Sequence, residues 1–421
     1  MKIESSEKNK KMIESNSWRE YLLVLGLAVL LIPFNYLPVA GQGHALTIEE
    51  LDQQATAYYE AGKYQQALPS AIQAFEFRKA LRTRETPGMA ASLNNLAEIY
   101  RNLGDYRRAK PLFEKSLQMY KALLDPDDPQ LATSYNSLAL VHYQIGEYGP
   151  AEKYFYKSLK ILDKTFGPRH PNQAAVINNL ARLYEANGAY PQAETLYEQS
   201  LGILKNALGP NHPNVAASLN NQALLYQRMG VNGEKVESIY KEALKIYKKA
   251  GQTNHPGFAS TLCNLGNFYL GIGEYEKALP RITQALSIRK KTLGARHPDL
   301  AGSLDGLARY DIAIGKFDDA EPLIRRSLAI RENAFGPNHP QVAHSLDTLA
   351  TFYQEIGQFE KAAPFFLRAL KIRRDSLGND HPDVGKSLRR LAEFYEDTGD
   401  HDRANSMYYS AVNVMKKNFN P

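Results

Sequence analysis

Cysteine and tryptophan are almost missing from this chain of 421 residues, which contains only Cys263 and Trp18. A single cysteine excludes an intramolecular disulfide framework and a zinc site built from cysteines. An excess of one charge is also missing, because 51 lysines and arginines stand against 45 aspartates and glutamates, which does not indicate nucleic-acid binding. With 43% hydrophobic and 23% charged residues, the chain fits neither a wholly disordered protein nor a membrane protein with several spans.

The motifs of common enzymes are absent too. The sequence has no G-x-x-x-x-G-K-[ST] phosphate loop, no G-x-S-x-G nucleophile motif, no H-E-x-x-H zinc motif and no dinucleotide-binding glycine cluster. Cys263 stands beside the core leucines of a predicted helix, so we expect a packing residue and not a nucleophile. We therefore expect a protein that is not an enzyme and that holds no metal and no cofactor.

The first 45 residues differ from the rest of the chain. A polar, basic stretch precedes the apolar run YLLVLGLAVLLI at residues 21–32. This run is shorter than the roughly 20 residues of a membrane-spanning helix and matches a signal-peptide core of about 7 to 15 residues. We predict that residues 1–45 are an export signal cleaved after Ala45. The alternative is an uncleaved anchor that associates with the membrane through residues 21–40. We thus expect the repeats to be exported, to the periplasm or the outside, or anchored at the membrane.

Beyond the leader the sequence repeats with a period of 42 residues, broken by one interval of 43. A proline heads nearly the same segment at Pro87, Pro129, Pro171, Pro213, Pro256, Pro298, Pro340 and Pro382. A marker glycine recurs in step and adds a unit before the first proline, at Gly62, Gly104, Gly146, Gly188, Gly230, Gly273, Gly315, Gly357 and Gly399. Such a fixed period is typical of solenoids and arrays.

Each unit contains two amphipathic halves. In the first half, apolar residues follow the i, i+3, i+4, i+7 spacing of one helix face, as in Leu93, Leu96, Ala97 and Tyr100. A second stripe follows the marker glycine, as in Ala109, Phe113, Leu117 and Tyr120. The pattern predicts an all-α, right-handed superhelical solenoid of about nine antiparallel helix pairs over residues 46–421. Prolines in the second half predict a late or distorted start of those helices, at Pro69, Pro111, Pro280, Pro322 and Pro364.

These residues resemble tetratricopeptide repeats, in which L-x-x-L-A-x-x-Y is followed by a glycine, an aromatic residue and A-x-x-x-[FY]-x-x-[SA]-L. The period of 42 and segments such as SLNNLAEIYRNLGDYRRAKPLFEKSL are similar to the kinesin-light-chain type. The resemblance covers about residues 47–420. His142 and Asp311 depart from it at the tyrosine position of the first helix, as do Val236 at the turn alanine and His401 at the aromatic position.

Six histidines stand directly before the marker prolines: His170, His212, His255, His297, His339 and His381. A row of metal ligands is one interpretation. Neighbouring units of stacked helix pairs are roughly 16 to 20 Å apart, because each packed helix takes 8 to 10 Å, whereas zinc needs ligands at about 2 Å. Thr86 and Asp128 occupy the same position in other units, so we expect these histidines to begin helices.

Polar residues in the middle of the first helices form the candidate binding site. Asparagine is a poor helix former, yet it recurs there through five units, and its amide can both donate to and accept from a peptide backbone. The resemblance implies that such asparagines bind a peptide segment in the concave groove; the alternative is that they only join adjacent repeats. The candidate residues are Asn94, Asn95, Asn136, Asn178, Asn179, Asn220, Asn221, Asn264, Asn267, Arg309, Asp347 and Arg389, with Asp305 and Arg390 on the same track.

Two further features suggest partners. Basic residues end the later second helices, and we interpret them as a solvated outer face, with an acidic partner or anionic lipid as the alternative: Arg289, Lys290, Lys291, Arg325, Arg326, Arg331, Arg368, Lys371, Arg373 and Arg374. The last helix carries an apolar stripe, Met407, Tyr408, Val412, Met415 and Phe419, and we expect end-to-end self-association or a docked partner to cover any exposed part of it. We expect a scaffold that binds a protein or peptide segment, and no nucleic acid. The rival function is a membrane-tethered assembly factor with an empty groove.

Overall fold

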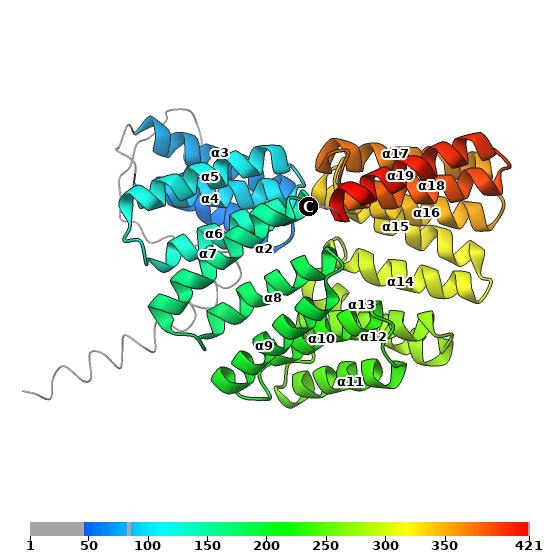
Figure 1. The fold of residues 1–421 in the computed structure, drawn as a ribbon, viewed down its shortest axis with the longest axis horizontal. Helices are drawn as coiled ribbons and strands as arrows, with labels where there is room; N and C mark the ends of the chain where they lie inside the picture. Colours follow the sequence, from blue (N-terminus) through cyan, green and yellow to red (C-terminus); the bar gives the residue numbers. More distant parts are fainter. Residues whose placement is uncertain (1–45, 82–85, 420–421) are drawn as a thin grey trace, which may run out of the picture.

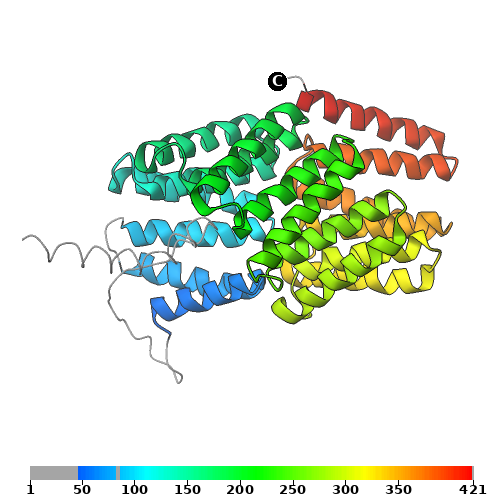
Figure 2. The same cartoon turned by 90° about the horizontal axis from the view of Figure 1, so that it is seen from below.

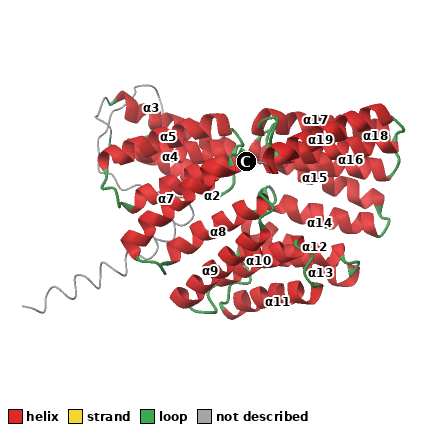
Figure 3. Cartoon of the chain, in the orientation of Figure 1, coloured by secondary structure: helices red, strands yellow, loops and turns green. Residues whose placement is uncertain are grey.

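The computed structural model of the chain describes residues 46–81 and 86–419, and all regular structure there is helical (Figure 3). The leader predicted at residues 1–45 lies outside the described residues. The eighteen helices of the described residues form nine consecutive pairs, which we number as units 1 to 9. This confirms the predicted solenoid of helix pairs. None of these helices is long and apolar enough to cross a bilayer.

The first helices of units 1 to 9 are α2 (Ile48–Glu60), α4 (Pro87–Asn102), α6 (Pro129–Gln144), α8 (Pro171–Ala186), α10 (Pro213–Arg228), α12 (Pro256–Gly271), α14 (Asp299–Ala313), α16 (Pro340–Glu355) and α18 (Pro382–Asp397). The second helices are α3 (Tyr64–Ala80), α5 (Tyr106–Leu123), α7 (Tyr148–Phe166), α9 (Tyr190–Leu208), α11 (Gly233–Lys249), α13 (Tyr275–Leu293), α15 (Phe317–Phe335), α17 (Phe359–Leu377) and α19 (His401–Phe419).

The alanine of each pattern lies where the two helices of a unit cross. Ala97 on α4 and Ala109 on α5 are both 0% exposed, and large side chains such as Phe113 fill the space beside them. Small residues let two helix backbones approach closely, so the sequence pattern sets the geometry of each pair. Cys263 is buried at 4% exposure, as expected of a packing residue.

The prediction of a late start for the proline-containing second helices is wrong. Helices α3, α5, α13, α15 and α17 begin at an aromatic residue five positions before the proline, which lies inside the helix. In α5 the aromatic residue, Tyr106, is 7% exposed, and the Asp105 side chain accepts from the backbone N–H of Arg108. Packing of the aromatic ring and this cap hold the start of the helix. A proline this near the end removes only one helical hydrogen bond.

The array curls until its first units meet its last ones (Figure 1). The start of α3 contacts the end of α15, and the start of α5 contacts the end of α17. The rings of Tyr64 and Phe335 stack with centroids 5.9 Å apart, and Leu377 joins the hydrophobic core of units 1 to 4. Figure 2 shows the same arrangement from below, with the blue and yellow helices meeting end to end. The solenoid therefore closes on itself after six units.

Candidate functional site

The predicted binding residues lie on the first helices, which form the inner side of the curve. Successive first helices contact each other in the pairs α4–α6, α6–α8, α10–α12, α12–α14 and α14–α16, whereas successive second helices do not approach to the same extent. A stack of helix pairs curves towards the helices that lie closer together. The face that carries the asparagines is therefore the concave one.

Asparagines of neighbouring units are joined side chain to side chain, always from Nδ2 of the later unit to Oδ1 of the earlier one. The pairs are Asn179 to Asn136 at 3.1 Å, Asn221 to Asn178 at 3.1 Å and Asn264 to Asn220 at 3.0 Å. We call these six residues the amide ladder. It runs without a break across α6, α8, α10 and α12, since each of these helices supplies at least one member.

The amide ladder keeps hydrogen-bonding capacity for a ligand. A carboxamide has two N–H donors and an oxygen that accepts two hydrogen bonds, and most members use only one of these. Asn220 is 9% exposed and also donates to Asn221 at 3.4 Å, while the other five members are half-buried and reach solvent. Contact between adjacent repeats is thus observed, and it leaves room for the second role, contact with a ligand, which stays a prediction.

The remaining predicted residues differ in exposure. Asn94 is 3% exposed, and Asn95 and Asn267 are half-buried. The Oδ1 atoms of Asn94 and Asn267 are buried and accept no hydrogen bond from the described residues. Arg309 and Arg389 are exposed. Asn94 and Asn267 are available only to a ligand that reaches between the helices. Arg309 is open to solvent, whereas Arg389 pairs with Glu393 at 3.0 Å.

Asp347 is placed in a buried network of ion pairs. It is 2% exposed and lies 2.7 Å from Arg373 and 2.6 Å from Arg390, in the register that the amide ladder has in earlier units. One unit earlier, Asp305 pairs with Arg331 at 2.7 Å. Both carboxylates are therefore neutralised inside the protein, whereas the predicted residues Arg309 and Arg389 remain exposed.

The prediction of a solvated outer face is wrong for three basic residues. Arg289, Arg331 and Arg373 are 7%, 6% and 8% exposed, whereas Lys290, Arg326 and most of the others are exposed. The three side chains extend from second helices to serine hydroxyls on the first helices, which shields them from water. Their spacing of 42 residues was the signal for burial, because a position that recurs in phase with the core is a packing position.

The electrostatics of His344 agree with a concave surface. The side chain is exposed, yet desolvation by surrounding protein, followed by the charge of Arg331, lowers its pKa. The nearby protein thus restricts the hydration of this exposed ring.

The six histidines before the marker prolines begin helices, as predicted. In each, Nδ1 accepts the backbone N–H two residues later, at 2.9 to 3.2 Å. A ring nitrogen that accepts a hydrogen bond carries no proton, so this cap requires the neutral imidazole. Within the described ranges, no three histidine, cysteine, aspartate or glutamate side chains gather as metal ligands would.

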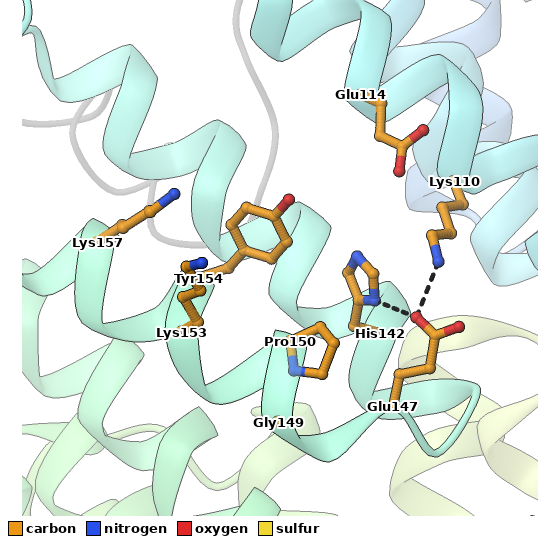
Figure 4. Close-up of a pocket in the computed structure, with 9 residues that line it drawn as sticks. All are labelled: Lys110, Glu114, His142, Glu147, Gly149, Pro150, Lys153, Tyr154 and Lys157. Carbon is orange, nitrogen blue, oxygen red and sulfur yellow. Dashed lines mark hydrogen bonds and ion pairs between the residues drawn. The ribbon is translucent and has the colours of Figure 1, made fainter.

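A separate pocket of about 540 Å³ opens between α5 and α7 (Figure 4). His142, which is 5% exposed, hydrogen-bonds through Nδ1 to Glu147, and Glu147 also accepts from Lys110 at 2.8 Å. Desolvation and then the Lys110 charge lower the pKa of His142, while Glu147 acts in the opposite direction. The pocket is lined by Lys110, Glu114, His142, Glu147, Gly149, Pro150, Lys153, Tyr154 and Lys157.

This pocket lies where a repeated contact is replaced. In four other units the tyrosine of a first helix donates to a glutamate of the preceding second helix, in the pairs Tyr184–Glu152, Tyr226–Glu194, Tyr269–Glu237 and Tyr353–Glu321. The equivalent positions here are His142 and Lys110, bridged by Glu147. Three lysines and two glutamates around an open pocket select weakly for charge, and we assign it no ligand.

The sequence and the fold were compared with those of known proteins. The family model of the tetratricopeptide repeat matches residues 88–164, 151–206, 173–249, 232–291, 257–333, 311–375 and 348–417. No curated protein matches the sequence.

Solved structures are similar in fold. A Rap protein complexed with competence and sporulation factor has a TM-score of 0.57 at 14% identity, covering 88% of this chain and 99% of that chain. BtubC from P. vanneervenii has a TM-score of 0.42 at 23% identity, covering 58% of this chain and 92% of that chain. A putative kinesin light chain from Podosopora anserina has a TM-score of 0.40 at 28% identity, covering 49% of this chain and 97% of that chain. The repeat matches span most of the chain, in agreement with the 42-residue unit of the kinesin-light-chain type. The chain belongs to the tetratricopeptide repeat family.

Proposed function

We propose that this chain is a non-catalytic scaffold that binds an extended peptide or protein segment along the amide ladder on its concave face. The observation that carries the proposal is the row of amides, five of them half-buried, that are paired between neighbouring units across α6, α8, α10 and α12. An extended strand presents backbone N–H and C=O groups at regular intervals, and carboxamides can pair with both. The Rap protein of similar fold was solved in complex with a bound factor, which supports a binding role for this architecture.

The test uses peptides selected from a random display library on the full-length protein. The variant Asn179→Ala/Asn221→Ala removes two half-buried amides from the ladder, and Asn206→Ala removes an exposed asparagine from the outer helix α9 as a matched control. Since each amide contributes about 1 kcal/mol of hydrogen bonding, we expect the double variant to bind the selected peptide at least about tenfold more weakly, and the control to bind it normally.

Both variants must be compared well below their unfolding temperatures, because the two asparagines also donate to Asn136 and Asn178. We expect the double variant to lose about 1 to 2 kcal/mol of unfolding free energy through these inter-unit bonds. Full peptide affinity together with that loss of stability would assign the ladder to adjacent repeats alone and would contradict the proposal.

An assembly role by self-association is the second candidate. On the last helix, Tyr409 is 72% exposed and Val412 is 46% exposed, an unusual apolar surface for the end of a solenoid. Sedimentation of the full-length protein and of Tyr409→Ser/Val412→Ser over a concentration series tests this. Association that is abolished by the double substitution supports the second candidate, and a single monomer mass throughout contradicts it.

We also propose that the scaffold works outside the cytoplasm or at the membrane, on the basis of the leader sequence alone. The intact mass of the protein recovered from membrane and soluble exported fractions tests this. A mass that begins after Ala45 indicates a cleaved signal, and a full-length mass in the membrane fraction indicates an anchor. Full-length protein in the cytoplasm would contradict both.

A further inference from the structure

Three buried arginines occupy the same position in consecutive units. Arg289 on α13, Arg331 on α15 and Arg373 on α17 are spaced by 42 residues and are each less than a tenth exposed. Each guanidinium contacts a serine hydroxyl of the next first helix, in the pairs Arg289–Ser303, Arg331–Ser345 and Arg373–Ser387. The three arginines thus share their position, their burial and their contact with a serine hydroxyl.

The two later arginines are neutralised by aspartates of their own units. Arg331 lies 2.7 Å from Asp305, and Arg373 lies 2.7 Å from Asp347, in both cases 26 residues earlier in the chain. A buried cation is costly unless a carboxylate and further hydrogen bonds compensate it. The repeat therefore carries a built-in counter-ion for this arginine in units 7 and 8.

Unit 6 lacks that counter-ion. The residue 26 positions before Arg289 is Cys263, a thiol in place of the carboxylate. The Arg289 guanidinium donates to Ser303 at 2.6 Å and to Ser260 at 3.0 Å, and its Nε is buried without a partner. Among the described residues, Arg289 forms no ion pair. Two neutral hydroxyls leave this buried positive charge uncompensated.

The uncompensated guanidinium can be reached from the concave face. Gly302 stands where later units place the exposed side chains of His344 and Lys386. A Cβ at Gly302 would lie 3.9 Å from Nη1 of Arg289 and would meet nothing else within 4 Å. Ser260, which holds Nη2, is half-buried. The absence of a side chain at position 302 therefore leaves a small opening over the guanidinium.

This opening lies at the end of the amide ladder. Asn264, the last donor of the ladder, directly follows Cys263 on α12. A segment bound to the ladder would bring its side chains or its end to the opening above Arg289. The planar guanidinium of an arginine fits a carboxylate through two parallel hydrogen bonds.

We propose that Arg289 is the receptor for a single carboxylate of the bound segment, which takes the place of the aspartate that unit 6 lacks. This inference rests on the proposed function, since it assigns one chemical requirement to the ligand of the amide ladder. The carboxylate comes from an aspartate or glutamate side chain or from a free C-terminus. Ser260 and Ser303 orient the guanidinium towards it.

Two substitutions at one position give a matched test. Cys263→Asp places in unit 6 the counter-ion of units 7 and 8, and Cys263→Asn introduces a side chain of the same shape without the charge, as found in four earlier units. We expect Cys263→Asp to unfold at a higher temperature than Cys263→Asn. We also expect acetate, compared with chloride at equal ionic strength, to raise the unfolding temperature of the wild type and Cys263→Asn but not of Cys263→Asp.

Selected peptides identify the source of the carboxylate. We expect that replacing one acidic side chain of a peptide by its amide, or amidating its C-terminus, weakens binding to the wild type and to Cys263→Asn at least about tenfold. The same change should have no effect on Cys263→Asp, nor on Arg289→Leu, which carries the residue found at this position in units 3 and 4. Arg289→Leu provides the comparison if the aspartate variant does not fold.

The outcomes separate the two proposals. Equal acetate effects on Cys263→Asp and Cys263→Asn, or equal binding of acidic and amidated peptides to the wild type, would overturn the carboxylate site even if the ladder binds peptide. If no peptide is selected at all, the proposed function fails, and the acetate and unfolding measurements still decide whether Arg289 binds a carboxylate.

Discussion

The imidazole of His339 rests on Gly104, 235 residues earlier in the chain. A Cβ built on Gly104 would lie 2.6 Å from Cδ2 of the histidine, so no other residue fits in that turn without movement. The same contact joins Gly62 to His297 and Gly146 to His381. Each of these histidines both begins a first helix in units 7 to 9 and fills a glycine turn in units 1 to 3. These three contacts hold the solenoid closed.

Substitution of Gly104 by alanine tests the closure. Gly104 has φ +70°, and Gly273, which has φ +78° at the same turn of unit 6 and nothing within 4 Å of its Cβ position, is the control. Both variants should lose about 1 to 2 kcal/mol, because a side chain in a left-handed conformation is strained. Only Gly104→Ala should also show a larger radius of gyration in small-angle scattering. Equal dimensions for the two variants would contradict the role of this contact.

Acidification should weaken the closure through His339. Its ring accepts the N–H of Gln341, lies within hydrogen-bonding reach of the Asn102 backbone and is close to the charge of Arg331. Burial lowers its pKa to about 4. Since the folded protein binds this proton less readily than the unfolded chain, the stabilisation is complete above pH 6.5 and is lost as the pH falls towards 4, by up to about 3 kcal/mol.

The variant His339→Asn tests the predicted loss of stability on acidification. His339→Asn keeps a side chain that caps a helix but does not titrate. Urea unfolding at pH 7 and pH 5 should show a smaller loss of stability on acidification for His339→Asn than for the wild type. His297 and His381 also have lowered pKa values, mainly from desolvation, and should leave some pH dependence in the variant. If His339→Asn and the wild type lost the same stability on acidification, His339 would not be the group whose protonation weakens the closure.

Removal of the Asp347 charge should be far more harmful than removal of a surface charge. Asp347→Asn leaves the buried Arg373 without its counter-ion, which we expect to cost about 3 to 5 kcal/mol. Asp375 pairs with Lys371 at 2.7 Å, but both side chains are exposed, so Asp375→Asn should change stability by less than about 1 kcal/mol. Denaturant unfolding of both variants measures the difference, and similar losses would contradict the buried network.

The tyrosine–glutamate contact can be restored in unit 3. Burial, followed by the hydrogen bond to Glu194, raises the pKa of Tyr226 to about 12, so the phenol stays protonated and donates a hydrogen bond to the carboxylate over the physiological range. We expect His142→Tyr and Lys110→Glu to rebuild this bond together. In a double-mutant cycle the combined variant should be more stable than the sum of the single changes by about 1 kcal/mol. Additive effects would show that the replaced pair makes no equivalent contact.

The helix pairs and their inner face could be predicted from the sequence because both depend on local spacing. The alanine at each crossing, the asparagines on the first helices and the capping histidines recur every 42 residues, and each is explained within one unit or between neighbours. The start of α5 could not be predicted, since the packing of the Tyr106 ring outweighs the loss of one hydrogen bond at Pro111.

The closure could not be predicted from the repeat. The contact of Gly104 with His339 depends on the angle between successive units accumulated over six steps, and small changes in each step would move the two residues apart. Burial of Arg289 was also missed, because a basic residue near a helix end is usually solvated. Its recurrence at Arg331 and Arg373, opposite Asp305 and Asp347, distinguishes it from its exposed neighbours.

The central claim is that a peptide lies along the amide ladder, and photo-crosslinking tests it most directly. A photoreactive phenylalanine analogue is placed at Ala217, which is exposed on α10 one helical turn from Asn221, and separately at Asn206 on the outer helix α9. We predict that a selected peptide crosslinks to position 217, that unlabelled peptide competes for this reaction, and that position 206 does not react. Crosslinking at 206 but not at 217 would show that the peptide binds elsewhere and would contradict the account.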